Sequence, residues 1–241
     1  MNQEIMFPVA ERFVSVNGEG LRAGRLAAFI RMTGCNLACS WCDTAWANDE
    51  SCVHENLSVQ QLVAWVSGTC VSCVTLTGGE PALQPGLSAL IEALALSDTW
   101  GNDNKRVIEI ETNGSVDLAA LHELRWSLKH IVSVPTTIAF TVDCKLPSSG
   151  MFSEMLESNY DLLESEDAVK FVVASKEDME AAYDRIKAYS LCSTCEVLFS
   201  PVFSCIEPAD IVVFMEEKQL PEVRLQLQLH KVIWPNVDKG V

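Results

Sequence analysis

The sequence predicts an α/β fold in which parallel strands form an incomplete, TIM-like barrel within a single domain, residues 1–241. Two observations predict it. Apolar, β-branched segments alternate with segments of helical periodicity, as is typical of parallel sheets, and polar motifs follow one strand after another. In parallel α/β folds the C-terminal ends of the strands share one face. An open, doubly wound sheet is the alternative, but the convergence of these motifs on one mouth favours the barrel.

The predicted helices and strands follow from the hydrophobic periodicity of the chain and from the capping and turn residues that bound each segment. Ser58 is a suitable N-cap for the first helix, and β-branched runs bounded by Gly, Asn or Pro indicate the strands. The segment Asn-Gly-Glu-Gly, residues 17–20, allows either a plain turn before the first strand or close approach of the backbone to a ligand. The predicted strands are 26–32, 73–77, 106–110, 138–142, 168–173, 196–199 and 224–229, and the predicted helices are 58–67, 85–96, 116–128, 151–163, 176–189 and 208–218.

Composition restricts the class of protein. The chain is 49% hydrophobic, enough for a sizeable core, and no apolar run is long enough to span a membrane. Its net charge of −16 argues against nucleic-acid binding, which needs a positive field. Residues 1–11 lack the layout of a signal peptide. Ten unevenly spaced cysteines in a chain of this length favour metal ligation in a reducing cytoplasm over disulfides.

Three of those cysteines follow the first predicted strand at C-x3-C-x2-C spacing: Cys35, Cys39 and Cys42. Three thiolates can hold three irons of a [4Fe–4S] cluster and leave the fourth iron open to bind a small molecule. A zinc site with three protein ligands, or buried thiols that happen to lie close, are the alternatives. The later motifs favour the cluster.

Four motifs at the ends of later strands would share the mouth with this loop. Gly78-Gly79-Glu80-Pro81 offers close backbone approach and a carboxylate beside a cationic ligand, although a plain strand-to-helix loop has the same composition. The other three motifs are Glu111-Thr112-Asn113-Gly114, Asp143-Cys144-Lys145 and Ser200-Pro201-Val202.

Two further cationic or titratable residues lie near this mouth. Arg31 precedes the cysteine loop and needs an anion, either a structural carboxylate or that of a substrate. His230, followed by Lys231, ends the last predicted strand. A lone histidine is more often a hydrogen-bonded core residue than a ligand contact, and that interpretation stays open.

The cysteine spacing resembles that of the radical S-adenosylmethionine (SAM) enzymes, and the order of the later motifs agrees. The resemblance implies a radical SAM core that binds SAM on the open iron. In that family Gly-Gly-Glu-Pro lies along the methionine part of SAM, and the motifs on later strands hold its adenosine and carboxylate parts. The implied cofactor contacts are Asn36, Trp41, Asp43, Gly78, Gly79, Glu80, Glu111, Asn113, Asp143, Cys144, Lys145, Ser200 and Pro201.

More specific segments resemble the 7-carboxy-7-deazaguanine synthase family. They are Ser-Val-Asn-Gly-Glu-Gly before the first strand, Arg31 ahead of Gly-Cys-Asn, Cys-Asp-Thr at the end of the loop, and Gln-Leu-His-Lys-Val-Ile-Trp near the C-terminus. The resemblance implies a ring-contracting lyase that converts 6-carboxy-5,6,7,8-tetrahydropterin to 7-carboxy-7-deazaguanine and releases ammonia. A 5′-deoxyadenosyl radical from SAM would start the reaction, so no catalytic side chain is implied beyond the cluster-bound SAM.

The same resemblance implies Mg²⁺ and a set of substrate contacts. Thr44 matches the magnesium ligand, and Arg31 and His230 would hold the substrate carboxylate. Two departures affect these contacts: Asn17 stands where the family usually has glutamine, and the chain continues beyond Pro235, whereas some members end in a proline that touches the substrate. The remaining implied contacts to the pterin are Val16, Asn17, Gly18, Glu19 and Thr77.

Two rival functions share part of this evidence. An enzyme that installs a glycyl radical on a large partner has the same cysteine spacing, but it does not need an Arg/His pair or Thr44. A non-catalytic zinc or iron–sulfur module is suggested by the pairs Cys70/Cys73 and Cys192/Cys195. These pairs are predicted at the N-terminal ends of strands, away from the mouth, where buried thiols are the better interpretation.

The resemblance also implies partners. A flavodoxin-like protein would supply the electron, and the chain would form a homodimer. Because the electron donor and this chain would both be acidic, we expect a local basic patch beside the cysteine loop, formed by Arg22, Arg25 or their neighbours.

Overall fold

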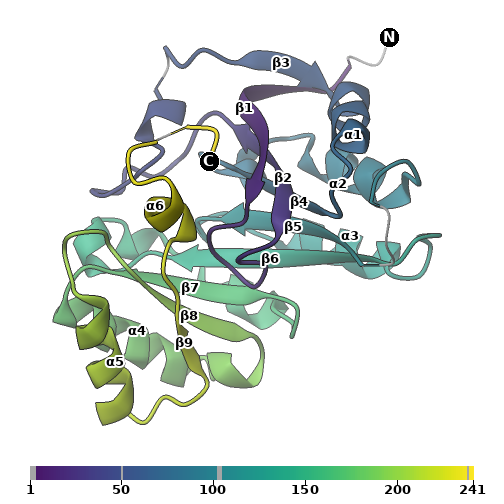
Figure 1. Cartoon of the computed structure of the whole chain (residues 1–241). Coiled ribbons are helices and arrows are strands. Elements are labelled where there is room, and N and C mark those ends of the chain that lie inside the picture. Colours follow the sequence, from purple (N-terminus) through teal and green to yellow (C-terminus); the bar gives the residue numbers. More distant parts are fainter. Residues whose placement is uncertain (1–3, 50, 102–104, 238) are drawn as a thin grey trace.

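The computed structural model describes residues 4–49, 51–101, 105–237 and 239–241, and within them the chain forms one nine-stranded sheet (Figure 1). Its strand order is β3-β1-β2-β4-β5-β6-β7-β8-β9, with β3 and β9 at opposite edges, so the sheet is not closed. The expected α/β partial barrel is therefore confirmed. The strands are β1 Met6–Val16, β2 Leu26–Met32, β3 Glu55–Ser58, β4 Cys73–Gly78, β5 Arg106–Thr112, β6 Thr136–Cys144, β7 Ala168–Val173, β8 Glu196–Pro201 and β9 Val223–Leu225.

Strand β2 and the strands from β4 to β9 pair in parallel, whereas β1 pairs antiparallel with both β2 and β3. The sequence did not predict β1 or β3, and the segment 17–20 lies in the connection directly after β1. In β1, Pro8 and the charged residues Glu11 and Arg12 interrupt the apolar residues, and no regular alternation marks the strand. Strand β3 is short and mostly polar.

The helices are α1 Val59–Gly68, α2 Leu87–Leu96, α3 Ala119–Leu128, α4 Lys176–Ala188, α5 Pro208–Glu217 and α6 Leu229–Ile233. Ser58 caps α1 as predicted, in a capping box with Gln61. The strand predicted over 224–229 is wrong in its second half, because β9 ends at Leu225 and His230 lies on α6. Among the described residues, no helix is long and apolar enough to cross a bilayer.

The helix predicted over 151–163 is also wrong. This segment forms short 3-10 turns at Phe152–Glu154 and Glu157–Leu162. The fully buried side chain of Asn159 accepts a hydrogen bond from N of Leu118 (3.0 Å) and donates to O of Val116 (2.8 Å). Because this asparagine serves the backbone of a neighbouring segment, its own segment is fixed in a non-helical path.

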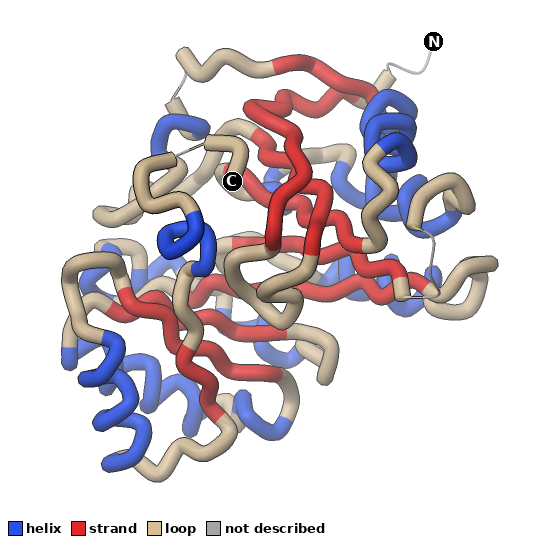
Figure 2. Tube along the Cα trace, in the orientation of Figure 1, coloured by secondary structure: helices blue, strands red, loops and turns tan. Residues whose placement is uncertain are grey.

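The two faces of the sheet have different chemistry. Successive side chains on a strand point to opposite faces, and on β5 the residues Ile108 and Ile110 lie in the main core, whereas Glu109 and Glu111 do not. That core joins one face of the sheet to helices α1 to α5 (Figure 2). The opposite face is lined by Thr, Glu, Asp and Lys side chains and forms the cavity described below.

A small apolar cluster closes the concave face at the N-terminal ends of the strands. It consists of Ala27, Phe29, Cys73 and Val107, with Phe13 stacked on Phe29 at 5.0 Å between ring centroids. This plug leaves the concave face accessible from the C-terminal ends, where the sequence predicted the mouth.

Candidate active site

A cavity of about 350 Å³ lies at the C-terminal ends of the strands. Its wall includes residues from the β1–β2 connection, the cysteine loop, strands β4 to β7 and α6. The structure thus brings together motifs that are far apart in the chain. The predicted site residues on its wall are Val16, Asn17, Gly18, Glu19, Arg31, Cys35, Cys39, Trp41, Cys42, Asp43, Thr44, Thr77, Gly78, Gly79, Glu111, Asn113, Asp143, Lys145 and His230.

Three free thiols, those of Cys35, Cys39 and Cys42, line the cavity from the loop after β2. Burial raises the pKa of Cys39, and the nearby positive charge of Lys145 opposes that rise. No described group of three or more His, Cys, Asp or Glu side chains is arranged to hold a metal ion, including these thiols and the pairs Cys70/Cys73 and Cys192/Cys195. In a [4Fe–4S] cluster each thiolate binds a different iron, so the loop fits that group in its donors and in its position on the cavity.

The two glycines after β4 are packed against the start of the cysteine loop. N of Gly79 donates to O of Met32 (3.0 Å) and N of Glu80 donates to O of Gly34 (2.8 Å). A Cβ on Gly79 would overlap O of Gly34, and a Cβ on Gly78 would overlap the backbone of Met32. The glycines are therefore needed for contact between two segments, in addition to lining the cavity.

Glu80 is fully buried and does not line the cavity. Its Oε1 accepts from N of Ala82 (2.9 Å) and Oγ1 of Thr112 (2.8 Å), and its Oε2 accepts from N of Asn113 (2.6 Å). Asn113 in turn donates from Nδ2 to Sγ of Cys35 (3.5 Å). The expected contact between Glu80 and a ligand is thus replaced by a positioning role, since Glu80 holds the residue that touches the first thiol.

Four more predicted cofactor contacts lie off the cavity. Asn36 donates to Oγ of Ser115 (2.8 Å), and the buried thiol of Cys144 meets the hydroxyl of Tyr160 at 3.0 Å. Burial raises the pKa of Cys144 to about 11, so it stays a neutral thiol. The residues outside the cavity wall are Asn36, Cys144, Ser200 and Pro201.

Arg31 meets both of the interpretations that the sequence left open, because it pairs with a structural carboxylate and also faces the cavity. Its Nε donates to Oε1 of Glu11 at 2.8 Å, so it has a structural carboxylate. That bond uses one of five guanidinium N–H groups, and Arg31 also lines the cavity. His230 lies on the same wall, and burial lowers its pKa, so the imidazole is neutral near pH 7. Arg31 supplies charge here, and His230 supplies a neutral hydrogen-bonding group.

Asn17 lines the cavity and also contacts a polar layer below it. Its Nδ2 donates to Oε2 of Glu109 (2.9 Å) and to Oγ1 of Thr75 (3.3 Å), and Oγ1 of Thr141 donates to Oε1 of Glu109 (2.8 Å). Burial raises the pKa of Glu109 to about 7, and the neighbouring carboxylate of Glu111 adds to the rise. The amide orientation of Asn17 is thereby set by a residue that the sequence did not single out.

Lys170 is the main residue that the sequence analysis missed. Its Nζ lies 3.0 Å from Oε2 of Glu19 and 3.7 Å from Oδ2 of Asp143, and Lys145 also pairs with Asp143 at 2.8 Å. A signal was present, because a lysine interrupts the otherwise apolar segment Ala168–Val173 and shares its strand face with Val172, another cavity residue.

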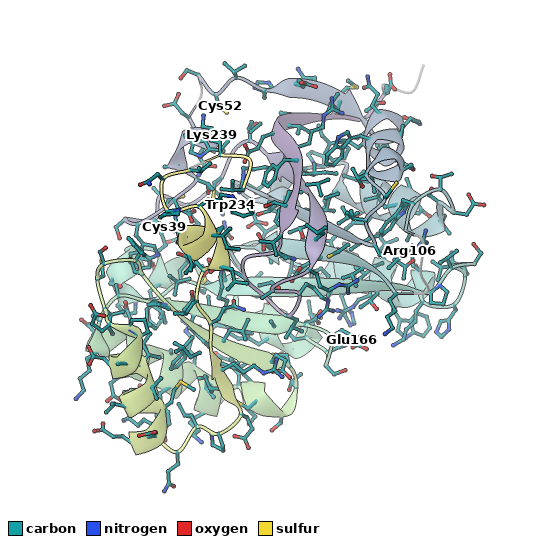
Figure 3. All side chains as sticks on the ribbon, in the orientation of Figure 1. Cys39, Cys52, Arg106, Glu166, Trp234 and Lys239 are labelled. Carbon is teal, nitrogen blue, oxygen red and sulfur yellow. The ribbon has the colours of Figure 1, made fainter. Side chains whose placement is uncertain are left out.

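The expected basic patch beside the cysteine loop is not formed by Arg22 and Arg25. Both lie in the connection before β2, whereas the cysteine loop follows β2. Arg25 instead lines a second cavity with Lys105, Arg106 and Lys129 at the start of β5. Figure 3 shows Arg106 on the opposite side of the molecule from Cys39. Arg22 and Arg25 precede β2 and the cysteine loop follows it, so the strand separates these arginines from the loop.

The parallel partial barrel and the cysteine loop at its mouth are the features of a radical SAM protein. The Radical SAM superfamily model matches residues 29–135. A 7-carboxy-7-deazaguanine synthase from Clostridium acetobutylicum is 41% identical over 98% of this chain and 99% of its own length. The chain therefore belongs to the 7-carboxy-7-deazaguanine synthase family, and membership of the superfamily implies SAM and a [4Fe–4S] cluster.

Other similarities extend over the whole chain. The synthase from Chlorobaculum tepidum is 32% identical over 100% of both chains. The fold is similar to that in the crystal structure of QueE from Escherichia coli, with a TM-score of 0.65, 22% identity, and coverage of 92% of this chain and 94% of that one. The latter likeness supports the partial-barrel fold.

Proposed function

We propose that this protein converts 6-carboxy-5,6,7,8-tetrahydropterin to 7-carboxy-7-deazaguanine with loss of ammonia. The observation that carries the proposal is the full-length match to curated synthases of that name, at up to 41% identity. The cavity agrees with it, since one pocket contains free thiols, an arginine and several acidic side chains.

Cys35, Cys39 and Cys42 would hold the cluster. When bound, the cluster supplies the electron that cleaves SAM, and SAM supplies the radical that takes a hydrogen atom from the substrate. Lys145 and Asp143 form an ion pair on the wall near Cys39 and offer both signs of charge to the amino-acid part of SAM. The residues of the chain therefore bind and orient SAM.

The substrate side is defined by Arg31 and His230. Arg31 neutralises the carboxylate of the pterin, and the neutral imidazole of His230 gives a hydrogen bond that does not add charge. Glu19, Thr77 and Glu111 offer acceptors to the N–H groups along the edge of the ring. With this division of roles, the carboxylate would lie near Arg31 and the amidine edge of the pterin near the acidic residues.

We assign Mg²⁺ to the cavity wall near Thr44. Magnesium prefers oxygen ligands and keeps several waters. Thr44 Oγ1 lies 3.7 Å from Sγ of Cys42, and among the described residues the buried oxygens Oδ1 of Asn48 and Oδ1 of Asp143 have no hydrogen-bond partner. Thr44 and Asn48 would contribute protein oxygens, and the substrate carboxylate and water would complete the coordination.

The remaining expectations are proposals as well. A flavodoxin-like protein would deliver the electron at the cysteine-loop side, the chain would act as a cytoplasmic homodimer, and neither nucleic acid nor membrane would take part. Sedimentation measurements test the dimer. Rates of reduction by flavodoxin at increasing ionic strength test for a charged docking surface.

The function is tested with anaerobically reconstituted protein. The protein is incubated with SAM, reductant and the carboxy-pterin, and deazapurine, 5′-deoxyadenosine and ammonia are measured. We expect deazapurine and ammonia in equal amounts. If 5′-deoxyadenosine forms without any deazapurine, the glycyl-radical activating function gains support and the proposal fails. Thr44→Val with and without added Mg²⁺ tests the magnesium assignment separately.

A further inference from the structure

Lys170 lies on β7 among apolar residues and is 8% exposed. Its neighbours Val169 and Phe171 belong to the main core on the other face of the sheet. A buried lysine is costly unless its charge is paired, and so the identity of its partners indicates what it does.

The partners come from both sides of the cavity. Nζ of Lys170 donates to Oε2 of Glu19 at 3.0 Å, and Glu19 lies in the β1–β2 connection on the expected pterin side. Nζ also lies 3.7 Å from Oδ2 of Asp143, which is opposite Lys170 in the parallel pairing of β6 and β7 and lies on the expected SAM side. One ammonium thus links two carboxylates that the proposed reaction uses for different ligands.

The two carboxylates depend on Lys170 to different degrees. Asp143 has a second cation, because Lys145 Nζ lies 2.8 Å from the same oxygen. In the described part of the chain, Glu19 forms an ion pair with Lys170 alone. Its second carboxylate oxygen, Oε1, accepts only the 3.3 Å hydrogen bond from Oγ of Ser200. Loss of Lys170 would therefore affect Glu19 more than Asp143.

We propose that Lys170 is a positioning residue that keeps Glu19 ionised and oriented as the acceptor for the ring N–H groups of the pterin. This inference rests on the proposed function. Glu19 has lone pairs left after its two bonds, so it can accept from a ligand while Lys170 holds it. Asp143 anchors Lys170 from the other side through the strand pairing.

The electrostatics agree with this role. Burial would raise the pKa of Glu19, but the charge and hydrogen bond of Lys170 outweigh burial and hold the pKa below its usual value. Burial would lower the pKa of Lys170, yet Glu19, Asp143 and Glu111 raise it, so the ammonium stays charged. The groups that face Glu19 from neighbouring elements are Lys170 on β7, Asp143 on β6, Glu111 on β5, Ser200 on β8 and His230 on α6.

The test compares Lys170→Met and Lys170→Arg with the wild type across pH. We expect Lys170→Met to raise KM for the pterin at least about tenfold, while the Kd for SAM changes less than about twofold because Lys145 still pairs with Asp143. The acid limb of kcat/KM should move up by about one pH unit, since Glu19 loses its cation. Lys170→Arg should restore most of both quantities. Lys218→Met, which removes a partly buried lysine paired with Glu180 away from the cavity, is the matched control.

The possible results distinguish failure of this inference from failure of the proposed function. An unchanged KM and acid limb in Lys170→Met, or an equal loss of SAM affinity, overturns the inference while leaving the proposed function intact. A wild-type protein that forms no deazapurine overturns the function itself. If Lys170→Met does not fold, Glu19→Gln replaces it in the test. That variant should lose the acid limb, and Lys170→Arg should then have no further effect in its background; independent penalties would refute the link.

Discussion

Glu11 joins Arg31 to the C-terminal segment. Its Oε1 accepts from Nε of Arg31 at 2.8 Å across the antiparallel pair β1–β2, and its Oε2 accepts from N of Gly240 at 3.1 Å. Lys239 lies over the Trp46 ring at 4.0 Å, and Val241 lines the cavity. The orientation of the proposed carboxylate-binding arginine is thereby tied to the segment that follows α6, which passes beside β1 in Figure 1.

Glu11→Gln should raise KM for the carboxy-pterin by about threefold to tenfold, because the charge-assisted bond to Arg31 is replaced by a weaker neutral one. Steady-state kinetics at saturating SAM measure it. Glu55→Gln is the control, since it removes the exposed Arg12–Glu55 pair from the same sheet and such pairs contribute about 0–1 kcal/mol. Equal KM values in the two variants would show that Glu11 does not contribute to substrate binding.

Gly79→Ala should displace the cysteine loop. The added Cβ would overlap the backbone O of Gly34 and the side-chain Oδ1 of Asn48. Because Gly34 O is a backbone atom, the methyl group fits only if the loop itself moves. We expect a large loss of bound iron after reconstitution, measured by iron analysis and visible absorbance. Gly68→Ala is the matched control, because nothing lies within 4 Å of a Cβ there and alanine favours the helix by about 1 kcal/mol. A full iron content in Gly79→Ala would show that the loop tolerates the shift.

Glu80→Ala should lower the free energy of unfolding by about 1–3 kcal/mol per unsatisfied buried donor. It would leave N of Asn113, N of Ala82 and Oγ1 of Thr112 without their acceptor. Urea unfolding of the protein without cluster measures this, and the exposed Glu92→Ala on α2 is the control. Equal midpoints for the two variants would contradict the positioning role of Glu80.

Glu109 should make the protein less stable as pH rises. Burial raises its pKa to about 7, above the value of about 4.3 in an unfolded chain, so the folded state binds the extra proton between these values. Its contribution is fully present below about pH 4 and is lost as pH rises through about 7, up to about 4 kcal/mol.

The test of that pH dependence is Glu109→Gln. Its stability relative to wild type should rise between pH 5 and pH 8, as measured by urea unfolding at each pH. Glu123→Gln, at an exposed position on α3, should follow the wild-type curve. Parallel curves for Glu109→Gln and wild type would show that Glu109 keeps an ordinary pKa.

The sequence predicted the mouth of the barrel because its signals are local. The thiols of Cys35, Cys39 and Cys42, like the motifs after the parallel strands, can be located from strand ends alone. Glu80 and Asn113 are different, because their hydrogen bond joins residues 33 positions apart. No local pattern shows that the carboxylate of the Gly-Gly-Glu-Pro motif points into the protein.

Strand β1 and Lys170 show two further limits. Apolar periodicity identifies strands that are buried in the sheet, but β1 carries Glu11 and Arg12 and is identified only by its partners β2 and β3. Lys170 looks like an interruption in an apolar strand until Glu19, 151 residues away, is placed beside it. In both cases the deciding contact is long-range.

The alternation of core and cavity residues along the strands has a consequence for mutational tolerance. On β5 a substitution at Ile108 or Ile110 affects packing against the helices, whereas one at Glu109 or Glu111 alters the charge of the cavity floor and wall. A substitution scan along residues 108–111 of β5 would therefore alternate, residue by residue, between effects on stability and effects on turnover. The core side of these two residue pairs is therefore the place to seek added stability, and the cavity side the place to seek altered chemistry.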